Sequence, residues 1–310
     1  MQAAKQLRDV TEEQAAKSYK DLIALPCPAP PSQGRAGLKT LDYFFLQHRL
    51  KAKTKRHISF VNALKNKGKL SFINDKVRKV RGLNPGSLGA RTLMRRRYSM
   101  FQLYYGTINQ FRPSEAKRIY CTLKPKVGIL DFSAGWGGRC LAAMACGIPY
   151  TGIDANTNME SSYKKMIKFC EPAAPTKMIF KPSETVDFSA VDYDLVFTSP
   201  PYFMLEEYER MPAYGSKAAF LEKFFRPVVL AAWKHLRVGG HMALNMPDEM
   251  YESVKGILPR LWKRMELPIM DRHAANAAKG VAIGAEGKVQ RSEGIFVWRK
   301  KSAGGVTRRK

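Results

Sequence analysis

A serine, two prolines and a tyrosine end a short apolar run in the stretch FTSPPYF, residues 197–203. Two consecutive prolines fix two φ angles, remove two backbone N–H donors and push Ser199 toward extended geometry. The stretch therefore presents mainly acceptors, namely the hydroxyl of Ser199 and nearby carbonyls, with the ring of Tyr202 beside them. Such a rigid set suits an incoming amino group, although an isolated pair of prolines is more often a strand end entering a loop.

A second stretch that can do chemistry is DFSAGWGG, residues 131–138, which also follows an apolar run. Gly135 and Gly137 allow a tight turn and a close approach of the backbone to a ligand. The next apolar segment ends in Asp154, a position from which a carboxylate accepts hydrogen bonds from ribose hydroxyls. The third glycine of the dinucleotide fingerprint is missing, and the carboxylate of Asp131 favours a cationic ligand over a phosphate.

S-adenosylmethionine has the chemistry that this set of residues requires. It offers an ammonium group to Asp131, a ribose to Asp154, and an adenine to the loop around Ser183 and Glu184. A glycine loop alone is weak evidence, but here it is combined with an acidic residue and with the sequence SPPY after a later strand. We therefore expect S-adenosylmethionine as the cofactor, and no metal.

Through DFSAGWG (131–137) and TSPPY (198–202), the chain resembles the amino-methyltransferases of nucleic-acid bases, the SPPY-type DNA cytosine-N4 and adenine-N6 family, over roughly residues 109–300. The resemblance implies that the target base is received by Ser199, Pro200, Pro201 and Tyr202. It implies cofactor binding by Phe111, Asp131, Phe132, Ser133, Ala134, Gly135, Trp136, Gly137 and Asp154. Further residues expected at the cofactor site are Ala155, Ser183, Glu184 and Thr198.

The chemistry of amino methylation gives the prolines a purpose. The exocyclic amine of a base is a poor nucleophile because its lone pair is delocalised into the ring. Acceptors that grip both N–H groups, which here are Ser199 Oγ and the Pro200 carbonyl, direct that pair toward the methyl group. Tyr202 is expected to stack on a base flipped out of its helix, with help from Phe203.

Several substrates remain open. Serine as the first motif residue resembles the cytosine-N4 enzymes, so DNA cytosine N4 is preferred. The cofactor loop precedes the catalytic motif, an order seen in many adenine-N6 and RNA-modifying relatives, so adenine N6 and RNA are alternatives. A function of another class is an inactive subunit that binds nucleic acid and uses the methyltransferase fold as a scaffold.

After about residue 126, short apolar strands alternate with helical stretches, which predicts a Rossmann-like, doubly wound, mostly parallel sheet of the class I methyltransferase type. Strands are expected at VGILDF, YTGID, KMIFK, YDLVFT, GHMALNM and EGIFVW, and a helix at 216–237. Asn245 and Asp248, at the end of the fifth strand, are expected near the ligand cleft.

The net charge of +27 lies mainly at the front of the chain, because residues 1–128 hold 27 Lys and Arg against 7 Asp and Glu. Such a field attracts polyanions. We expect a flexible leader (1–38), a basic helical nucleic-acid-binding extension (39–108), a methyltransferase domain (109–300) and a basic tail (301–310).

Helices with one basic face are expected at 40–67 and 90–105, and Arg91, Arg95, Arg96 and Arg97 are expected to bind phosphates. The alternative is that this run of charge is only a solvated helix face. Removal of residues 1 to about 105 is expected to weaken nucleic-acid binding and to spare cofactor binding.

The chain has no apolar run near the roughly 18 residues of a membrane span, and its first residues resemble no secretory signal or transit peptide. The five cysteines show no CxxC pairing. We therefore expect an intracellular protein with reduced thiols and nucleic acid as its partner, with DNA preferred to RNA.

Overall fold

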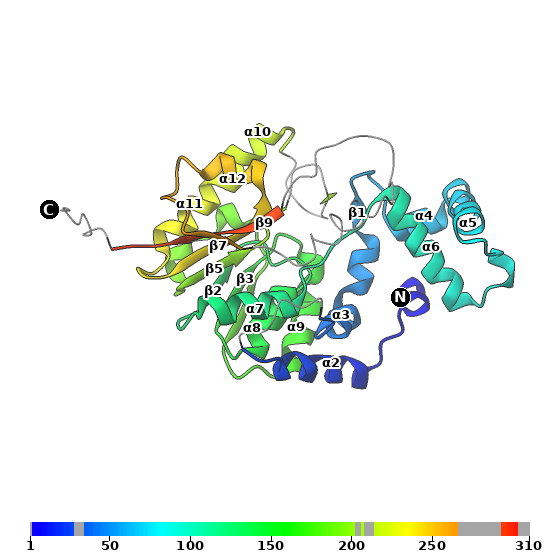
Figure 1. Cartoon of the computed structure of the whole chain (residues 1–310), viewed down its shortest axis with the longest axis horizontal. Coiled ribbons are helices and arrows are strands. Elements are labelled where there is room, and N and C mark those ends of the chain that lie inside the picture. Colours follow the sequence, from blue (N-terminus) through cyan, green and yellow to red (C-terminus); the bar gives the residue numbers. More distant parts are fainter. Residues whose placement is uncertain (1, 28–33, 202–205, 208–213, 266–292, 303–310) are drawn as a thin grey trace.

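The structure is a computed structural model that describes residues 2–27, 34–201, 206–207, 214–265 and 293–302. Its centre is a seven-stranded sheet with the order β4-β3-β2-β5-β7-β9-β8 (Figure 1). The strands are β2 (Ile129–Asp131), β3 (Tyr150–Ile153), β4 (Thr176–Ile179), β5 (Leu195–Thr198), β7 (His241–Pro247), β8 (Lys263–Met265) and β9 (Glu293–Arg299).

Neighbouring strands from β4 to β7 are parallel, whereas β9 runs antiparallel to β7 and to β8. This strand order, with one antiparallel strand near the edge, is that of the Rossmann-like class I methyltransferase fold. The predicted fold class and all six predicted strands are confirmed. β8 was not predicted, because its three residues, KRM, are too short and too charged to give an alternating pattern.

Alternate residues of the strands point to opposite faces of the sheet and form two cores. Ile129 and Leu195 lie on the face covered by α7 (Pro113–Leu123), α8 (Gly138–Ala145) and α9 (Glu160–Cys170). On the other face, Leu130 and Val196 pack with the segment of α10 (Lys217–Phe220), η5 (Leu221–Phe225) and α11 (Arg226–His235), and with α12 (Asp248–Val254).

The long helix predicted at 216–237 is present as the continuous run α10-η5-α11. Its middle turn, η5, is a π-helix that ends directly before Arg226 and Pro227. Proline has no N–H for the bond to the preceding turn, so the wider turn falls where a regular helical hydrogen bond cannot form.

A helical unit precedes the sheet in the sequence and extends away from it to the other end of the molecule (Figure 1). It contains α1 (Gln2–Leu7), α3 (Leu38–Lys51), α4 (Phe60–Lys65), α5 (Lys67–Arg81) and α6 (Ala90–Tyr105), whose buried residues include Leu50, Phe60, Ile73 and Phe101. The helix predicted at 90–105 is confirmed. The helix predicted at 40–67 is two helices, separated by β1 (Lys53–Thr54), which pairs with β6 (Glu206–Glu207).

The predicted flexible leader is wrong for part of its length, because it contains helix α1 and helix α2 (Glu12–Ala24). Leu22 of this helix is fully buried in the core on the face of the sheet that α7, α8 and α9 cover. Lys117 Nζ donates to the carbonyls of Leu22 and Ile23 at 3.0 and 2.8 Å, so a buried cation satisfies the C-terminal end of α2. The leader prediction rested on the proline-rich stretch, of which residues 28–33 lie outside the described residues.

The prediction of reduced thiols is wrong for two of the five cysteines. Cys27, just after α2, forms a disulfide with Cys121 of α7, with Cα atoms 5.4 Å apart. Sequence spacing gave no sign of the pair, because 94 residues separate the two cysteines and only the docking of α2 on α7 brings them together. Cys140, Cys146 and Cys170 are thiols.

Helix α3 belongs to two cores at once. Leu41 and Phe45 pack in the core between the sheet and α7, α8 and α9, whereas Leu46 and Leu50 pack in the core of the helical unit. Asp42 of the same helix is buried and forms ion pairs with Arg8 and Arg49. The division of the chain at residue 108 stays a prediction, but α3 ties both sides of it together. Among the described helices, none is long and apolar enough to cross a membrane.

Candidate active site

The glycine loop, Asp154 and Ser199 follow three strands that are neighbours in the sheet. β2 pairs in parallel with β3 on one side and with β5 on the other, so the carboxyl ends of all three lie at the same edge. The chain order reverses between β2 and β5, and doubly wound sheets bind ligands at this reversal. The fold therefore brings together three motifs that were predicted to act together.

Asp154 fastens the glycine loop to the end of β3. Its Oδ2 accepts a hydrogen bond from the backbone N–H of Gly135 at 2.8 Å, and its Oδ1 accepts one from Asn156 at 2.8 Å. Burial raises the pKa of Asp154 to about 6, although the two backbone hydrogen bonds and the charge of Arg139 act to lower it. Each carboxylate oxygen has a second lone pair, so the side chain can still accept from a ribose hydroxyl.

Asp131 lies in a buried network rather than at the surface of the loop. It is fully buried, and its Oδ2 accepts from Arg139 Nε and from the Tyr150 hydroxyl, each at 2.7 Å. Burial lowers the pKa of Arg139, but the charge of Asp131 outweighs this effect and raises it. The expected contact of Asp131 with an ammonium group is therefore not favoured by its surroundings, since a guanidinium already neutralises the carboxylate.

The same network shapes the loop after Asp131. Asp131 Oδ1 accepts a hydrogen bond from the backbone N–H of Ser133 at 3.3 Å, and Arg139 also donates to the Ser133 carbonyl. The role of Asp131 in the described structure is therefore to fix the start of the loop. Phe132, Ala134 and Trp136 are buried, whereas Ser133 and Ala155 are partly exposed.

The glycines of the loop are required by positive φ angles and by close neighbours. Gly135 and Gly137 have φ angles of 59° and 77°, which only glycine adopts without strain. A Cβ at Gly138 would lie 2.0 Å from the carbonyl oxygen of Phe111, so helix α8 begins in contact with that backbone. The ring of Phe111 packs edge-on to Phe197 of β5 at 5.4 Å between centroids, which places the predicted cofactor segment against β5 and the start of α8.

Ser199 follows β5 and is oriented by the neighbouring strand β7. Asn245 Nδ2 donates to Ser199 Oγ at 3.0 Å, and the side chain of Asn245 is 3% exposed. The hydroxyl keeps one lone pair and its own proton for a substrate. Thr198 and Pro200 are buried and Pro201 is partly exposed, whereas Tyr202 and Phe203 lie outside the described residues.

The loop after β4, predicted to receive adenine, contacts the end of β2. Ser183 is buried and donates to the carbonyl of Phe132 at 2.5 Å, so its hydroxyl is engaged within the protein. Glu184 is exposed and accepts from the Tyr214 hydroxyl at 3.0 Å. Of these two residues, Glu184 is the one whose position leaves it accessible.

Three of the four arginines predicted to bind phosphates have partners within the helical unit. Arg91 pairs with Asp9 at 3.2 Å, Arg95 donates to the carbonyl of Leu7 at 3.4 Å, and Arg97 donates to Asn74 at 2.8 Å. Arg96 is partly exposed. Burial lowers the pKa of Arg97. These contacts hold α6 against α1 and α5, and the role of the arginines in binding nucleic acid stays a prediction.

Several residues at the site were missed by the sequence analysis. Arg139 and Tyr150 hold Asp131, and the Tyr163 hydroxyl donates to the carbonyl of Gly135 at 2.8 Å. Phe45 of α3 packs edge-on to Tyr163 at 4.9 Å between centroids. Each acts from a different helix or strand, so no local pattern identifies it. Asn245, in contrast, was expected near the cleft because of its place at a strand end.

No protein-family model matches the sequence, and the search of curated proteins gives no match. Solved structures that are similar to part of the chain include TrmN of Thermus thermophilus, with 14% identity, 69% of this chain and 68% of that chain covered, and a TM-score of 0.43. An rRNA methylase of Streptococcus thermophilus is 11% identical, with 63% and 100% covered and a TM-score of 0.40.

A third similar structure is a SAM-dependent O-methyltransferase of Thermotoga maritima, with 13% identity, 66% and 71% covered, and a TM-score of 0.38. At these identities and TM-scores, the three structures do not indicate what this chain binds or modifies. The assignment of the fold above rests on the strand order of the chain itself.

Proposed function

We propose that the protein methylates an exocyclic amino group of a nucleic-acid base with S-adenosylmethionine, and that DNA cytosine N4 is the preferred target. The observation that carries the proposal is the hydrogen bond from Asn245 to Ser199 at the end of β5. It fixes the acceptor of a rigid Ser-Pro-Pro segment next to the strand that leads into the glycine loop. A simple strand end does not need a buried side chain to orient its serine.

The residues present fit S-adenosylmethionine at the ribose position and at the loop. Asp154 is at the end of β3 and its carboxylate can accept further hydrogen bonds, and Gly135 and Gly137 leave two positions of the loop without side chains. Among the residues of the predicted set, we propose that Ser133, Asp154, Ala155 and Glu184 make the contacts, and that Phe132, Ala134, Trp136, Ser183 and Thr198 support them from buried positions. The cofactor supplies a methyl group activated by a sulfonium.

The catalytic role of the chain is to place the amine. Ser199 Oγ and the Pro200 carbonyl each accept one N–H of the base, which turns the nitrogen lone pair toward the methyl group. The bound cofactor would supply the methyl group to this nitrogen, while Ser199 Oγ and the Pro200 carbonyl would hold its two N–H groups until one proton leaves to solvent. Both acceptors bind more strongly as positive charge develops on nitrogen, so they stabilise the transition state more than the ground state.

The basic charge of the N-terminal part supports a polyanionic substrate, because residues 1–128 contain 27 Lys and Arg but only 7 Asp and Glu. Adenine N6 and an RNA base are alternatives within the same chemistry, and an inactive nucleic-acid-binding subunit is the alternative of another class. Phosphate contacts carry no information about the sugar, so the charge favours neither DNA nor RNA.

The experiment is incubation of the full chain with labelled S-adenosylmethionine and mixed DNA and RNA, followed by mass spectrometry of the nucleosides. We expect N4-methylcytosine from DNA, and the Ser199→Ala variant as the matched control should form much less of it. Calorimetry with the cofactor alone separates the inactive subunit, which would bind nucleic acid but not cofactor. Cofactor binding without any methylated nucleoside would contradict the proposed substrate class.

A further inference from the structure

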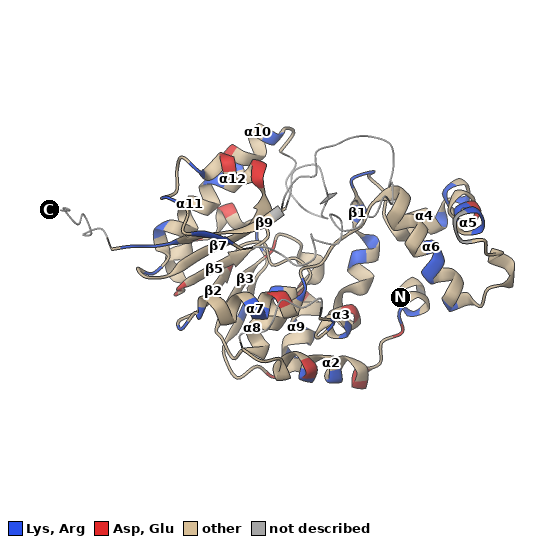
Figure 2. Cartoon of the chain, viewed as in Figure 1, with Lys and Arg blue, Asp and Glu red and all other residues tan. Residues whose placement is uncertain are grey.

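Helix α5 is the most basic described element of the helical unit, and its two flanks differ in chemistry. Its sequence, KGKLSFINDKVRKVR, contains six Lys and Arg and one Asp. Figure 2 shows this concentration of basic residues on α5, at the end of the molecule away from the sheet. One flank carries a polar groove and the other carries aromatic rings covered by lysines.

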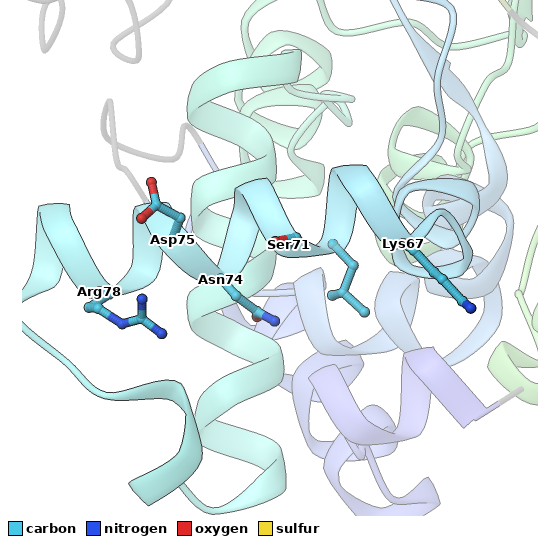
Figure 3. Close-up of a pocket in the computed structure, with 6 residues that line it drawn as sticks. Lys67, Ser71, Asn74, Asp75 and Arg78 are labelled. Carbon is cyan, nitrogen blue, oxygen red and sulfur yellow. The ribbon is translucent and has the colours of Figure 1, made fainter.

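The groove has a volume of about 580 Å³ and is lined by Lys67, Leu70, Ser71, Asn74, Asp75 and Arg78. Figure 3 shows Lys67 and Arg78 near its two ends, with Ser71 and Asn74 between them. Both cations are exposed, and neither forms an ion pair with another described residue, whereas Asp75 pairs with Lys79 at 3.3 Å. The groove thus offers two cations, the Ser71 hydroxyl and the amide N–H groups of Asn74 to an anionic chain, while Asn74 Oδ1 accepts from Arg97.

The aromatic flank consists of Phe72 of α5 with Tyr104 and Tyr105 of α6. Phe72 is 38% exposed, and its ring centroid lies 5.3 Å from that of Tyr104 and 6.1 Å from that of Tyr105. Lys76 Nζ lies 5.1 Å from the centroid of Phe72 and 5.3 Å from that of Tyr104, and Lys69 Nζ lies 5.4 Å from that of Tyr105. Phe72 is thus an exposed ring next to two partly buried rings and two lysines, and aromatic rings beside cations are the combination that binds unpaired bases and their phosphates.

The dimensions of α5 match a short strand. Lys67 and Arg78 are eleven residues apart, which is about 16 Å along a helix. At about 3.4 Å per nucleotide in a stacked strand, this length corresponds to about five nucleotides. A double helix presents only the edges of its bases and buries their faces in the stack, so its bases cannot stack on aromatic side chains.

We propose that α5 and the end of α6 form a docking surface for an unpaired nucleic-acid strand, with phosphates along the groove from Lys67 to Arg78 and bases stacked on Phe72 and Tyr104. This inference deepens the proposed function, because it names where the substrate strand is held, but its test requires neither cofactor nor methyl transfer. The surface differs from the arginines of α6, three of which hold α6 against its neighbours.

The test is fluorescence anisotropy with the full chain and a labelled 12-nucleotide strand, as RNA, as DNA and as duplex DNA of the same sequence. We expect Phe72→Leu to bind both single strands about 5- to 150-fold more weakly, the range for loss of one base-aromatic stack, and Phe72→Trp to bind them like the unaltered chain. Leucine keeps apolar packing against Tyr104, so a purely structural role for Phe72 would leave Phe72→Leu unchanged. Circular dichroism confirms that each variant is folded.

The matched control for the aromatic flank is Trp262→Ala. Trp262 is 47% exposed and has Lys263 Nζ 4.6 Å from its ring centroid, but it lies beside the sheet, next to β8. Equal losses from Trp262→Ala and Phe72→Leu, or duplex binding that equals single-strand binding, would overturn the proposal. So would a failure of the unaltered chain to bind any strand.

The groove has its own test. The Lys67→Gln/Arg78→Gln double variant should reduce the slope of log affinity against log salt by about 1.4, because each phosphate contact on a single strand contributes about 0.7. The control is Lys164→Gln/Lys165→Gln, which removes the same charge from exposed positions of α9. Equal slopes for the two double variants would overturn the groove assignment.

The same measurements distinguish RNA from DNA as the bound strand, and they distinguish this inference from the proposed function. Tighter binding of RNA or of DNA identifies the sugar that the surface prefers. Either ranking supports the proposal if Phe72→Leu weakens strand binding. Strand binding that depends on Phe72, without methyl transfer, would leave this inference standing and count against the proposed function. Methyl transfer by the protein, combined with unchanged strand binding by Phe72→Leu, would overturn this inference and support the proposed function.

Discussion

A Cβ added to Gly137 would lie 2.9 Å from Cε2 of Phe45, so helix α3 of the N-terminal part packs directly on the glycine loop of the candidate cofactor site. Phe45 is fully buried and packs edge-on to Tyr163, whose hydroxyl donates to the carbonyl of Gly135 at 2.8 Å. The loop is therefore held from outside the sheet, by Tyr163 of α9 and by Phe45, which precedes the first strand of the sheet by more than eighty positions.

The first prediction concerns this support. Phe45→Ala should lower the free energy of unfolding by about 3–5 kcal/mol, because it opens a cavity in a packed core. It should also weaken S-adenosylmethionine binding, since the cavity lies against the loop. Removal of residues 1–105 should weaken cofactor binding for the same reason, in contrast to the expectation drawn from sequence. Calorimetry and urea unfolding measure the two effects.

The control for Phe45 is Phe60→Ala. Phe60 is 1% exposed and lies in the core of the helical unit, which does not contain the glycine loop. We expect a similar loss of stability with little change in cofactor affinity under conditions where both variants are folded. If the two variants lost cofactor affinity equally, the effect would be one of general stability and not of contact with the loop.

The second prediction concerns pH. The pKa of Asp154 is raised from 3.8 to about 6, mainly by burial, so the protonated form is favoured in the fold and the group's contribution to stability is lost as pH rises through about 6. A ribose hydroxyl binds the ionised form better. Cofactor affinity should therefore rise between about pH 5 and 7, and binding near pH 6 should release a proton.

Calorimetry in buffers of different ionisation enthalpy measures that proton. The Asp154→Asn variant should bind the cofactor more weakly, by roughly the 1–3 kcal/mol of a lost charged hydrogen bond, and should show no pH dependence between 5 and 7. The same pH profile in this variant would show that another group titrates.

The strands were predictable from sequence because a buried parallel strand is a short apolar run between turn residues. VGILDF and YDLVFT carry this signal locally. The glycine loop and Asp154 were predictable because their places at strand ends follow once the strands are known. The contact between Asn245 and Ser199 was only partly predictable, since strand order decides which strand ends are neighbours.

The partners of Asp131 and the double packing of α3 could not be predicted from local pattern. Arg139 lies in a helix and Tyr150 in the next strand, so their convergence on Asp131 is a property of the assembled sheet. The apolar residues of α3 face two cores on different sides, so they give no single stripe, and the sequence analysis assigned the helix to a basic nucleic-acid-binding extension.

The third prediction concerns the buried pair of Asp131 and Arg139. Arg139→Met should destabilise the fold by about 3–5 kcal/mol, because it leaves a buried carboxylate without its cation. The double variant Asp131→Asn/Arg139→Met should be more stable than Arg139→Met alone, since the uncompensated charge is gone. Urea unfolding of the unaltered chain, Asp131→Asn, Arg139→Met and the double variant gives the coupling energy, and additive losses would show that the pair does not act as a unit.

The fourth prediction concerns the hydrogen bond from Asn245 to Ser199. If Asn245 orients the hydroxyl that accepts the target amine, Asn245→Ala should lower kcat while leaving KM nearly unchanged, because the bond from Ser199 matters most as charge develops on nitrogen. Ser199→Ala should lower kcat by about 10²-fold, the effect of losing one transition-state hydrogen bond. Cofactor affinity should be the same in both variants, because neither residue lies in the glycine loop.

The double variant Ser199→Ala/Asn245→Ala distinguishes positioning from an independent role. Asn245 acts through Ser199 in this scheme, so its removal should cost nothing further once the hydroxyl is absent, and the double variant should have the kcat of Ser199→Ala. Single-turnover methylation with separate binding titrations measures these terms. Losses that multiply would instead mean that the amide of Asn245, buried at the end of β7, contacts the substrate itself.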